Sequence, residues 1–376
     1  MKRIVIYILS TIFVLLFING CGEDRSHGDA TIVEFKAGQK WIYETDQGKE
    51  MLKNNFVYIP GGFDVDGDGN EESGFWLAQY EAKEDNQTFK TIDLDISGNI
   101  QKLLIDNFEV YNPDDRYKRF NKTLTTSSNY LDVSAQNIEK LEAFSVVFKD
   151  EGESLRSVSP IEAVISLENS QIDGGFDIKL PTEKQWMQIV KLVINNPSNW
   201  TDEEVGKGEL YQGDKYVGSN RKSFFIKNSI LGKDSLVPDD HEVEVFDLSG
   251  SVSEWTSGMV KASDRFLTGN SGKKEYSEVN NAPFWWKPTF EDKVLGSGDG
   301  AGMYHDGSSI DGASDTLLIS SDGTGEVDKY AVVARGGSNS ADDNNLVGIS
   351  AAKLGYGPGY KEKNIGFRAA SNYLTD

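Results

Sequence analysis

Hydrophobic residues occur along most of the chain as short runs separated by Gly, Asn, Asp and Ser. The run Phe56 to Ile59 predicts a strand, and the turn Pro60-Gly61-Gly62 follows it. A second strand is predicted from Gly74 to Tyr80, where Phe75, Leu77 and Gln79 alternate with Trp76 and Ala78. Together these residues predict a β-hairpin with a polar loop.

Residues 157–170 show helical periodicity. Pro160 stands near the start, and Ile161, Val164 and Ile165 fall on one face. This segment is therefore predicted to be a helix.

Residues 178–196 predict a second helix more strongly. Thr182 is a typical N-cap, and Gln185 occupies the capping-box position three residues later. The apolar stripe consists of Trp186, Ile189, Val190 and Val193. Outside these two segments the pattern predicts loops and short strands, with the helices confined to the middle of the chain.

The pattern also suggests where the folded part begins. Residues 21–50 are mostly polar and predict a tether that ends in a short strand around residues 41–43, so the folded domain is expected to span 51–376. Within it, residues 85–155 are Asn-, Asp- and Thr-rich and predict an insertion with some strand. The fold class expected is α+β, rich in loops.

The first 20 residues are typical of a bacterial lipoprotein signal peptide. Lys2 and Arg3 are followed by an apolar stretch from Ile4 to Ile18, and Cys21 comes directly after Gly20. The alternative is a transmembrane anchor, but this run has about 15 residues and a spanning helix needs about 20. We therefore expect Cys21 to be lipidated and to hold the protein in the membrane.

Composition narrows the chemistry further. Cys21 is the only cysteine in 376 residues, so the exported part has no disulfide and no thiolate site. The net charge is −22 and becomes −24 once Lys2 and Arg3 are removed, which disfavours binding to nucleic acid. The hydrophobic content of 38% is enough for a sizeable core.

Four separated segments occur in an order that resembles a known family. They are FVYIPGGF with FWLAQYEA, then KLPTEKQW, then VFDLSGSVSEWTSG, and finally RGGS leading to NIGFRAA. In this order they resemble the formylglycine-generating enzymes, or sulfatase-modifying factors, over residues 54–372. The resemblance implies a C-type-lectin-like fold with long loops.

The catalysis of that family is not expected here. Its copper-dependent members use two cysteines after the Gly-Gly-Ser, and the corresponding positions are Ala341 and Leu346, which cannot bind copper(I). An iron-dependent branch uses a His triad, whereas His27, His241 and His305 are scattered. The resemblance therefore predicts neither copper nor iron and no catalytic residue.

The resemblance does imply a calcium site. In the family, the third segment binds calcium through side-chain and backbone oxygens, which here belong to Asp247, Gly250, Val252 and Glu254. The alternative is a tight turn capped by Asp247.

A second, weaker calcium candidate lies in the hairpin loop. Asp64, Asp66 and Asp68, followed by Gly69, match the start of an EF-hand loop, but its twelfth position is Phe75 rather than Glu. The alternative is an ordinary acidic loop.

Residues 335–370 are most similar to the variable proteins of diversity-generating retroelements, in which a reverse transcriptase rewrites the end of the gene. The segment keeps Gly348, Leu354, Gly355 and the final Asn364 to Arg368. The resemblance implies a scaffold of fixed residues with exposed, changeable positions between them. We expect these to be Asn339, Asp342, Asp343, Asn345, Lys353, Tyr356, Tyr360 and Lys363. The alternative is a fixed loop.

These observations favour a non-enzymatic lipoprotein of the bacterial cell envelope. It is expected to bind a protein or glycan through the C-terminal face, with its membrane contact supplied by the lipid. Two alternatives remain: an enzyme of the same superfamily with other chemistry, and a structural envelope lipoprotein.

Overall fold

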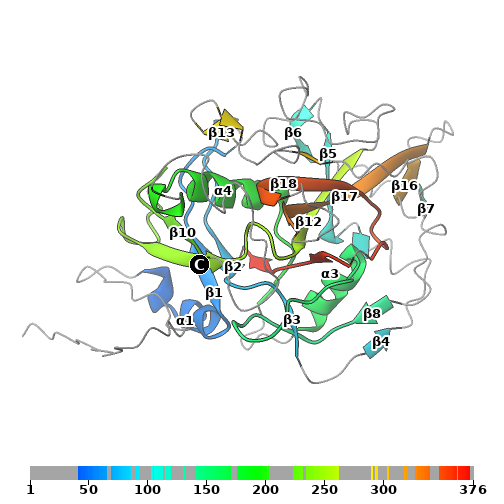
Figure 1. The fold of residues 1–376 in the computed structure, drawn as a ribbon, viewed down its shortest axis with the longest axis horizontal. Helices are drawn as coiled ribbons and strands as arrows, with labels where there is room; N and C mark the ends of the chain where they lie inside the picture. Colours follow the sequence, from blue (N-terminus) through cyan, green and yellow to red (C-terminus); the bar gives the residue numbers. More distant parts are fainter. Residues whose placement is uncertain are drawn as a thin grey trace, which may run out of the picture. The chain divides into compact units, whose positions relative to one another are not determined.

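The computed structural model combines helices with several small sheets and one large one (Figure 1). It describes residues 41–65, 69–85, 90–92, 103–104, 106–112, 115–119, 130–132, 141–170, 176–200, 202, 223–231, 234–261, 289–290, 293–294, 303–304, 317–320, 327–338, 347–361 and 363–372. The fold class is α+β, as predicted. The predicted signal peptide and Cys21 lie outside the described residues.

The predicted hairpin is present. Strands β1 (Phe56–Ile59) and β2 (Phe75–Ala78) pair antiparallel, and every residue of both strands is buried. Strand β20 (Ala370–Ser371) then pairs with the other edge of β2. The end of the chain thus completes a sheet that begins near residue 56.

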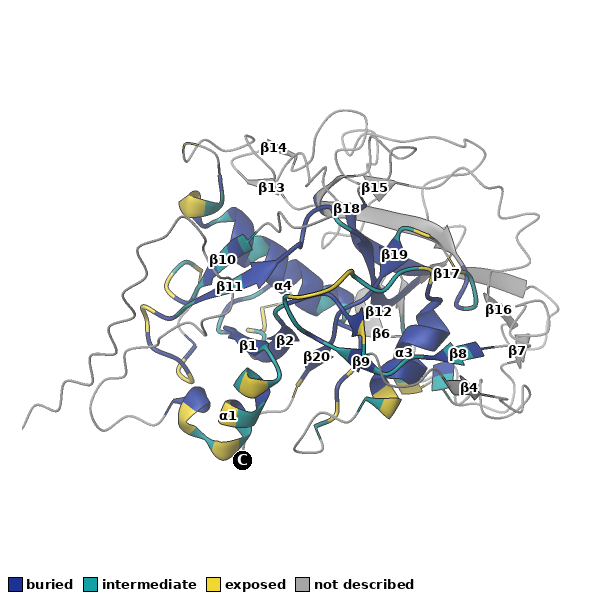
Figure 2. Cartoon of the chain, turned by 60° about the horizontal axis from the view of Figure 1, so that its bottom comes forward, coloured by how far each residue is buried: buried dark blue, intermediate teal, exposed yellow. Residues whose placement is uncertain are grey.

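Both predicted helices are confirmed. Helix α3 (Pro160–Asn169) has Pro160 in its first turn. Helix α4 (Glu183–Ile194) has the predicted capping box, in which the Gln185 amide donates to Thr182 Oγ1 at 3.0 Å and the Thr182 amide donates to Gln185 Oε1 at 2.9 Å. Figure 2 shows that α3 and α4 are largely buried, whereas a further helix, α1 (Asp46–Lys53), exposes part of its surface.

The prediction for residues 41–50 was wrong in part. A 3₁₀ turn, η1 (Ile42–Glu44), and a helix, α1 (Asp46–Lys53), replace the expected strand and tether end. Residues 41–43 are buried, and the Ile42 amide donates to the Leu236 carbonyl at 3.0 Å. Thr45 caps α1 by accepting from the Gly48 amide at 2.9 Å. A short polar helix was missed because its stability comes from contacts with distant residues.

A large sheet contains the C-terminal segment. Strand β12 (Ser253–Lys261) pairs antiparallel with β17 (Val327–Gly337), which pairs antiparallel with β18 (Val347–Tyr356). Further strands of this sheet are β5 (Glu109–Asn112), β6 (Asp115–Arg119), β7 (Tyr130–Asp132), β15 (Met303–Tyr304), β16 (Leu317–Ser320) and β19 (Ile365–Gly366). Strand β18 was not predicted, because its sequence has no clear strand period.

The remaining elements form small pairs. They are β10 (Ser223–Lys227) with β11 (Glu242–Phe246), β3 (Lys83–Glu84) with β9 (Val146–Val147), β4 (Lys90–Ile92) with β8 (Leu141–Ala143), and β13 (Thr289–Phe290) with β14 (Lys293–Val294), together with the 3₁₀ turn η3 (Pro197–Asn199). The segment 85–155, expected to be an insertion, supplies β4 to β8 and β9. Because β5 pairs with β12, part of this segment belongs to the large sheet.

Two clusters of buried apolar side chains form the core. One includes α3, Trp76 and Trp255, and the other includes α4, β10 and β11. Within the described part of the chain, no helix combines the length and apolar character needed to span a bilayer.

Candidate functional site

The segments that carry the family resemblance are joined in the core by two buried Arg–Glu pairs. The first links β17 to the start of α4: Arg335 Nε donates to Glu183 Oε2 at 3.0 Å, and Arg335 Nη2 contacts the same oxygen. Thr256 of β12 also donates to Glu183, from Oγ1 to Oε1 at 2.7 Å. Both charged side chains are fully buried, so each depends on the other for its charge balance.

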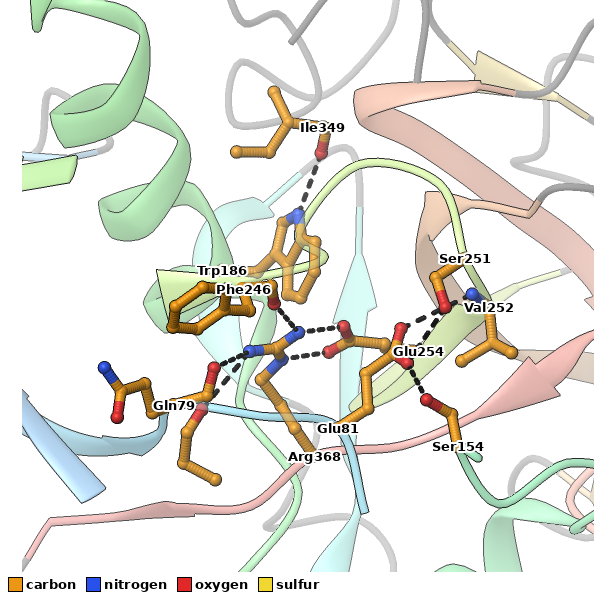
Figure 3. Close-up of polar contacts among 11 residues, drawn as sticks. Gln79, Glu81, Ser154, Trp186, Phe246, Ser251, Val252, Glu254, Ile349 and Arg368 are labelled. Carbon is orange, nitrogen blue, oxygen red and sulfur yellow. Dashed lines mark hydrogen bonds and ion pairs between the residues drawn. The ribbon is translucent and has the colours of Figure 1, made fainter. Parts of the chain in front are cut away.

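The second pair links the Gly-Phe-Arg segment to β12 (Figure 3). Arg368 donates through Nε and Nη2 to the two carboxylate oxygens of Glu254. It also donates from Nη2 to the Phe246 carbonyl at 2.9 Å and from Nη1 to the Ala78 carbonyl at 3.2 Å. Burial raises the pKa of Glu254, while Arg368 opposes that shift. Burial also disfavours the charged form of Arg368, but Glu254 and then Glu81 keep its pKa above the usual value.

A third buried carboxylate, Glu81, lies beside this pair. Figure 3 shows it among Ser154, Ser251 and Val252, all of which donate to it. The Ser251 hydroxyl is 3.1 Å from Glu81 Oε2, and the Val252 amide is 3.4 Å from Oε1. Burial, and then the charge of Glu254, raises the pKa of Glu81 to about 7. The protonated form of Glu81 is therefore favoured relative to an exposed carboxyl.

This arrangement bears directly on the calcium site predicted at Asp247, Gly250, Val252 and Glu254. Both oxygens of Glu254 accept from Arg368, so they face a guanidinium rather than a site for a cation. The turn itself is tight, with Asp247 and Ser251 at a φ of 58°. Over the described residues, no three His, Cys, Asp or Glu side chains are grouped so that they could hold a metal ion. As placed here, Glu254 is not free to bind calcium, because both of its carboxylate oxygens accept from Arg368.

The weaker candidate in the hairpin loop is described only in part, because Asp66 and Asp68 lie outside the described residues. Asp64 Oδ2 accepts from the Gly69 amide at 2.8 Å, as in a turn stabilised by its own side chain. Lys191 of α4 donates from Nζ to the carbonyl of Val65, and the carbonyl of Asp64 lies 3.5 Å away. In the described part of this loop, a lysine therefore contacts two of the backbone oxygens.

In the C-terminal segment 335–370, the chain is fixed on both sides of the connection between β17 and β18. At one end, Gly336 and Gly337 have φ values of 84° and 71°, and the Gly336 carbonyl accepts from the Gly250 amide at 2.9 Å. At the other end, Trp186 Nε1 of α4 donates to the Ile349 carbonyl at 3.1 Å (Figure 3). Gly337 and Val347 face each other across the two strands. The chain between them thus leaves and re-enters the sheet at fixed points.

The residues predicted to bind a ligand fall into three groups. Asn339, Asp342, Asp343 and Asn345 lie outside the described residues, as do Ala341 and Leu346. Lys353 and Tyr356 belong to β18, opposite Ala334 and Val332 of β17, and only their backbone is described. Lys363 is exposed, whereas Tyr360 is half-buried and packs against the core.

A buried polar cluster that was not predicted from the sequence lies beside the N-terminal helices. Tyr43 Oη and His241 Nε2 are 2.9 Å apart, and the Tyr58 amide donates to Tyr43 Oη at 3.0 Å. Asp234 Oδ2 accepts from the Tyr58 hydroxyl at 2.9 Å and from the Gly61 amide at 2.8 Å. The sequence signal that could have indicated this cluster is Trp41-Ile42-Tyr43, three large apolar residues in an otherwise polar stretch. His241 Nε2 also lies 3.3 Å from the Tyr58 carbonyl oxygen, whereas His27 and His305 lie outside the described residues.

Comparison with known proteins adds no relative. No protein-family model matches the chain, and no curated protein matches its sequence. The family resemblance therefore depends on the motif residues themselves.

Proposed function

We propose that this chain is a lipid-anchored binding protein of the bacterial cell envelope. Its domain has a C-type-lectin-like fold of the formylglycine-generating-enzyme type, and the segment 335–364 forms its ligand-binding face. Cys21 carries the lipid, and the ligand is a protein or a glycan. The closest resemblance is to the variable proteins of diversity-generating retroelements.

The main support for the proposal is the pair of long strands, β17 and β18, that lies on either side of the proposed binding segment. Strands β17 and β18 lie side by side, and Gly337 faces Val347 at the point where the chain leaves the pair. Arg335 is held by Glu183, and the Ile349 carbonyl is held by Trp186. Residues between these points can change without removing any of those contacts, which is what a changeable binding surface requires.

The polar residues of the motifs support a binding role over a catalytic one. Glu183, Arg335, Glu254 and Arg368 are all buried, and their charges are directed at each other. A group that reacts with a substrate must instead reach it within hydrogen-bonding distance. Ala341 and Leu346 also supply no thiol in place of the family's copper ligands.

Comparison of this gene between sister isolates tests the proposal. We expect amino-acid differences to concentrate between Ser338 and Lys363, at codons that contain adenine in a repeated template. Gly336, Ile349, Gly366 and Arg368 should stay constant, because each has a fixed structural contact. Uniform invariance from 338 to 363 would contradict a variable binding face.

The lipid anchor has its own test. We expect the Cys21→Ser variant to lose incorporation of labelled fatty acid and to leave the membrane fraction. A Ser26→Ala variant, five residues further on, serves as the control and should stay membrane-bound. Retention of the Cys21→Ser chain in the membrane would favour an uncleaved anchor instead.

A further inference from the structure

The last part of the proposed binding segment lies against helix α3. The Ile161 amide, in the first turn of that helix, donates to the Pro358 carbonyl at 3.1 Å. The Tyr360 amide donates to the Gly357 carbonyl at 3.1 Å, which closes a turn. Gly357 and Pro358 are buried, and Tyr360 is half-buried and packs against the core. This part of the segment is therefore attached to the domain by both its backbone and its side chains.

A lysine adds two ion pairs to this attachment. Lys361 Nζ lies 2.6 Å from Glu162 Oε1 and 3.1 Å from Glu142 Oε2, so it joins the segment to α3 and to β8. Burial acts against the charged form of Lys361, but its bonds to Glu162 and Glu142 outweigh burial and raise its pKa. The ammonium group therefore stays charged between the two carboxylates.

Glu162 depends on this lysine for its charge balance. Its side chain is fully buried, and its other partners are neutral donors. The Glu142 amide donates to Oε1 at 2.7 Å, and the Ser159 amide donates to Oε2 at 3.0 Å. Among the residues that the structure describes, Lys361 is the only cation within ion-pair distance of Glu162. Because a buried charge without a counter-charge is costly, position 361 is not free to change.

The proposed binding segment is thus attached to two helices. Near the start of β18, Trp186 of α4 donates to the Ile349 carbonyl, and beyond the end of β18 the chain is bound to α3. A binding surface benefits from such rigid support, since ordering a loose segment on binding lowers the affinity.

We infer that Lys361 is a positioning residue for the proposed binding face and that residues 357–361 are its fixed anchor. The inference rests on the proposed function and narrows it, because contacts with the ligand then come from the rest of the segment 335–364. Tyr360, which the sequence predicted to be changeable, belongs to the anchor because it packs against the core. A ligand that bound through Lys361 would have to compete with two carboxylates that are already paired with it.

Hydrogen exchange of the full chain in detergent tests the inference. We expect Lys361→Met to speed the exchange of the Tyr360 and Ile161 amides at least about tenfold, because both amides bond within the anchor. The Trp186 amide, which donates to the Thr182 carbonyl in α4, serves as the internal reference and should keep its rate. Unchanged exchange at Tyr360, or equal acceleration at Trp186, would overturn the inference.

Two further variants serve as controls. Lys361→Arg keeps the positive charge and should restore most of the protection. Lys179→Met removes an exposed ion pair, in which Lys179 Nζ lies 3.1 Å from Asp177, and should leave the exchange at Tyr360 unchanged. If Lys361→Met does not fold, Lys361→Met combined with Glu162→Gln replaces it, since no unpaired charge is then left. Failure of Lys361→Arg to restore protection would also contradict a role for the charge.

Sequences from sister isolates separate this inference from the proposed function. Residues 357–361 should be constant where other positions of the segment differ. Differences at Tyr360 and Lys361 as frequent as those elsewhere in the segment would overturn the anchor but leave the binding face in place. Invariance over the whole of 338–363 would instead contradict the proposed function, whatever the exchange rates show.

Discussion

At the scale of single residues, Arg368 has the largest set of buried partners described here. It binds Glu254 and the carbonyls of Ala78 and Phe246, so it joins the hairpin, β11 and β12. Arg368→Met should lower the free energy of unfolding by about 3–5 kcal/mol, because it leaves the charge of Glu254 buried without a partner. Urea denaturation measures the loss.

Two further variants separate this effect from a general loss of packing. Adding Glu254→Gln to Arg368→Met should recover part of the loss, since no unpaired charge is then left. Lys53→Met removes an exposed ion pair, in which Lys53 Nζ lies 2.6 Å from Glu50, and should cost less than about 1 kcal/mol. Equal losses for Lys53→Met and Arg368→Met would contradict the assignment of a buried pair.

His241 makes stability depend on pH. Burial lowers its pKa to about 4 from 6.5, although contacts with Tyr58 and Asp234 act in the opposite direction. Between pH 4 and pH 6.5 the ring of His241 is protonated in the unfolded chain but not in the folded one. The contribution of the neutral ring to the free energy of unfolding is therefore fully present above pH 6.5 and is lost as the pH falls toward 4. This pKa shift corresponds to roughly 3 kcal/mol of the free energy of unfolding.

The test is the urea midpoint between about pH 4 and 7.5. We expect the midpoint to fall with acidification in the unmodified chain and to fall less in His241→Gln, which has no titrating ring. An identical slope in the two proteins would show that other groups cause the acid sensitivity.

At the scale of helices and strands, the local sequence was sufficient to predict an element when that element is stabilised by its own residues. Helix α4 was predictable because its N-cap Thr182, the capping-box residue Gln185 and the apolar stripe lie within the helix or directly before it. Helix α1 was not predictable from local signals. The turn that leads into it, residues 41–43, is buried by contacts with residues near 236 and 241, which lie far away in the sequence. Strand β18 was missed because Gly348, Ala351, Ala352 and Gly355 have low strand propensity, and its pairing with β17 and β15 supplies the order instead.

Gly336 shows how closely elements approach each other. Its φ is +84°, and a Cβ added there would lie 2.9 Å from the Leu248 carbonyl oxygen. Gly336→Ala should therefore cost about 2 kcal/mol or more, combining the left-handed backbone with the clash. The control is Gly69→Ala, which has a similar φ of +88° but open space around it and should cost only about 1 kcal/mol. Equal costs in urea denaturation would show that the contact with Leu248 is unimportant.

At the scale of the whole molecule, the sequence shows the four motif segments and their order along the chain. What the sequence did not reveal is that Glu183 binds Arg335 and that Glu254 binds Arg368, since pairs 152 and 114 residues apart leave no local pattern.

Calcium provides a test of the whole domain. Because Glu254 is bound to Arg368, we expect the melting temperature of the purified chain to be the same with calcium and with a chelator. A binding ion would instead stabilise the folded state and raise the melting temperature. A clear decrease on chelation would restore the calcium site and require Glu254 to turn away from Arg368.

The position of β20 has a consequence for synthesis. Strand β2 lacks its second neighbour, and Glu254 lacks its cation, until residues 368–371 have been made. The domain therefore cannot complete its core until the last residues of this segment have been synthesised. A frameshift or stop codon between residues 338 and 363 would remove these last contacts. Such a chain would be degraded as unfolded protein, so changes in this segment are tolerated only when they keep the reading frame through residues 368–371.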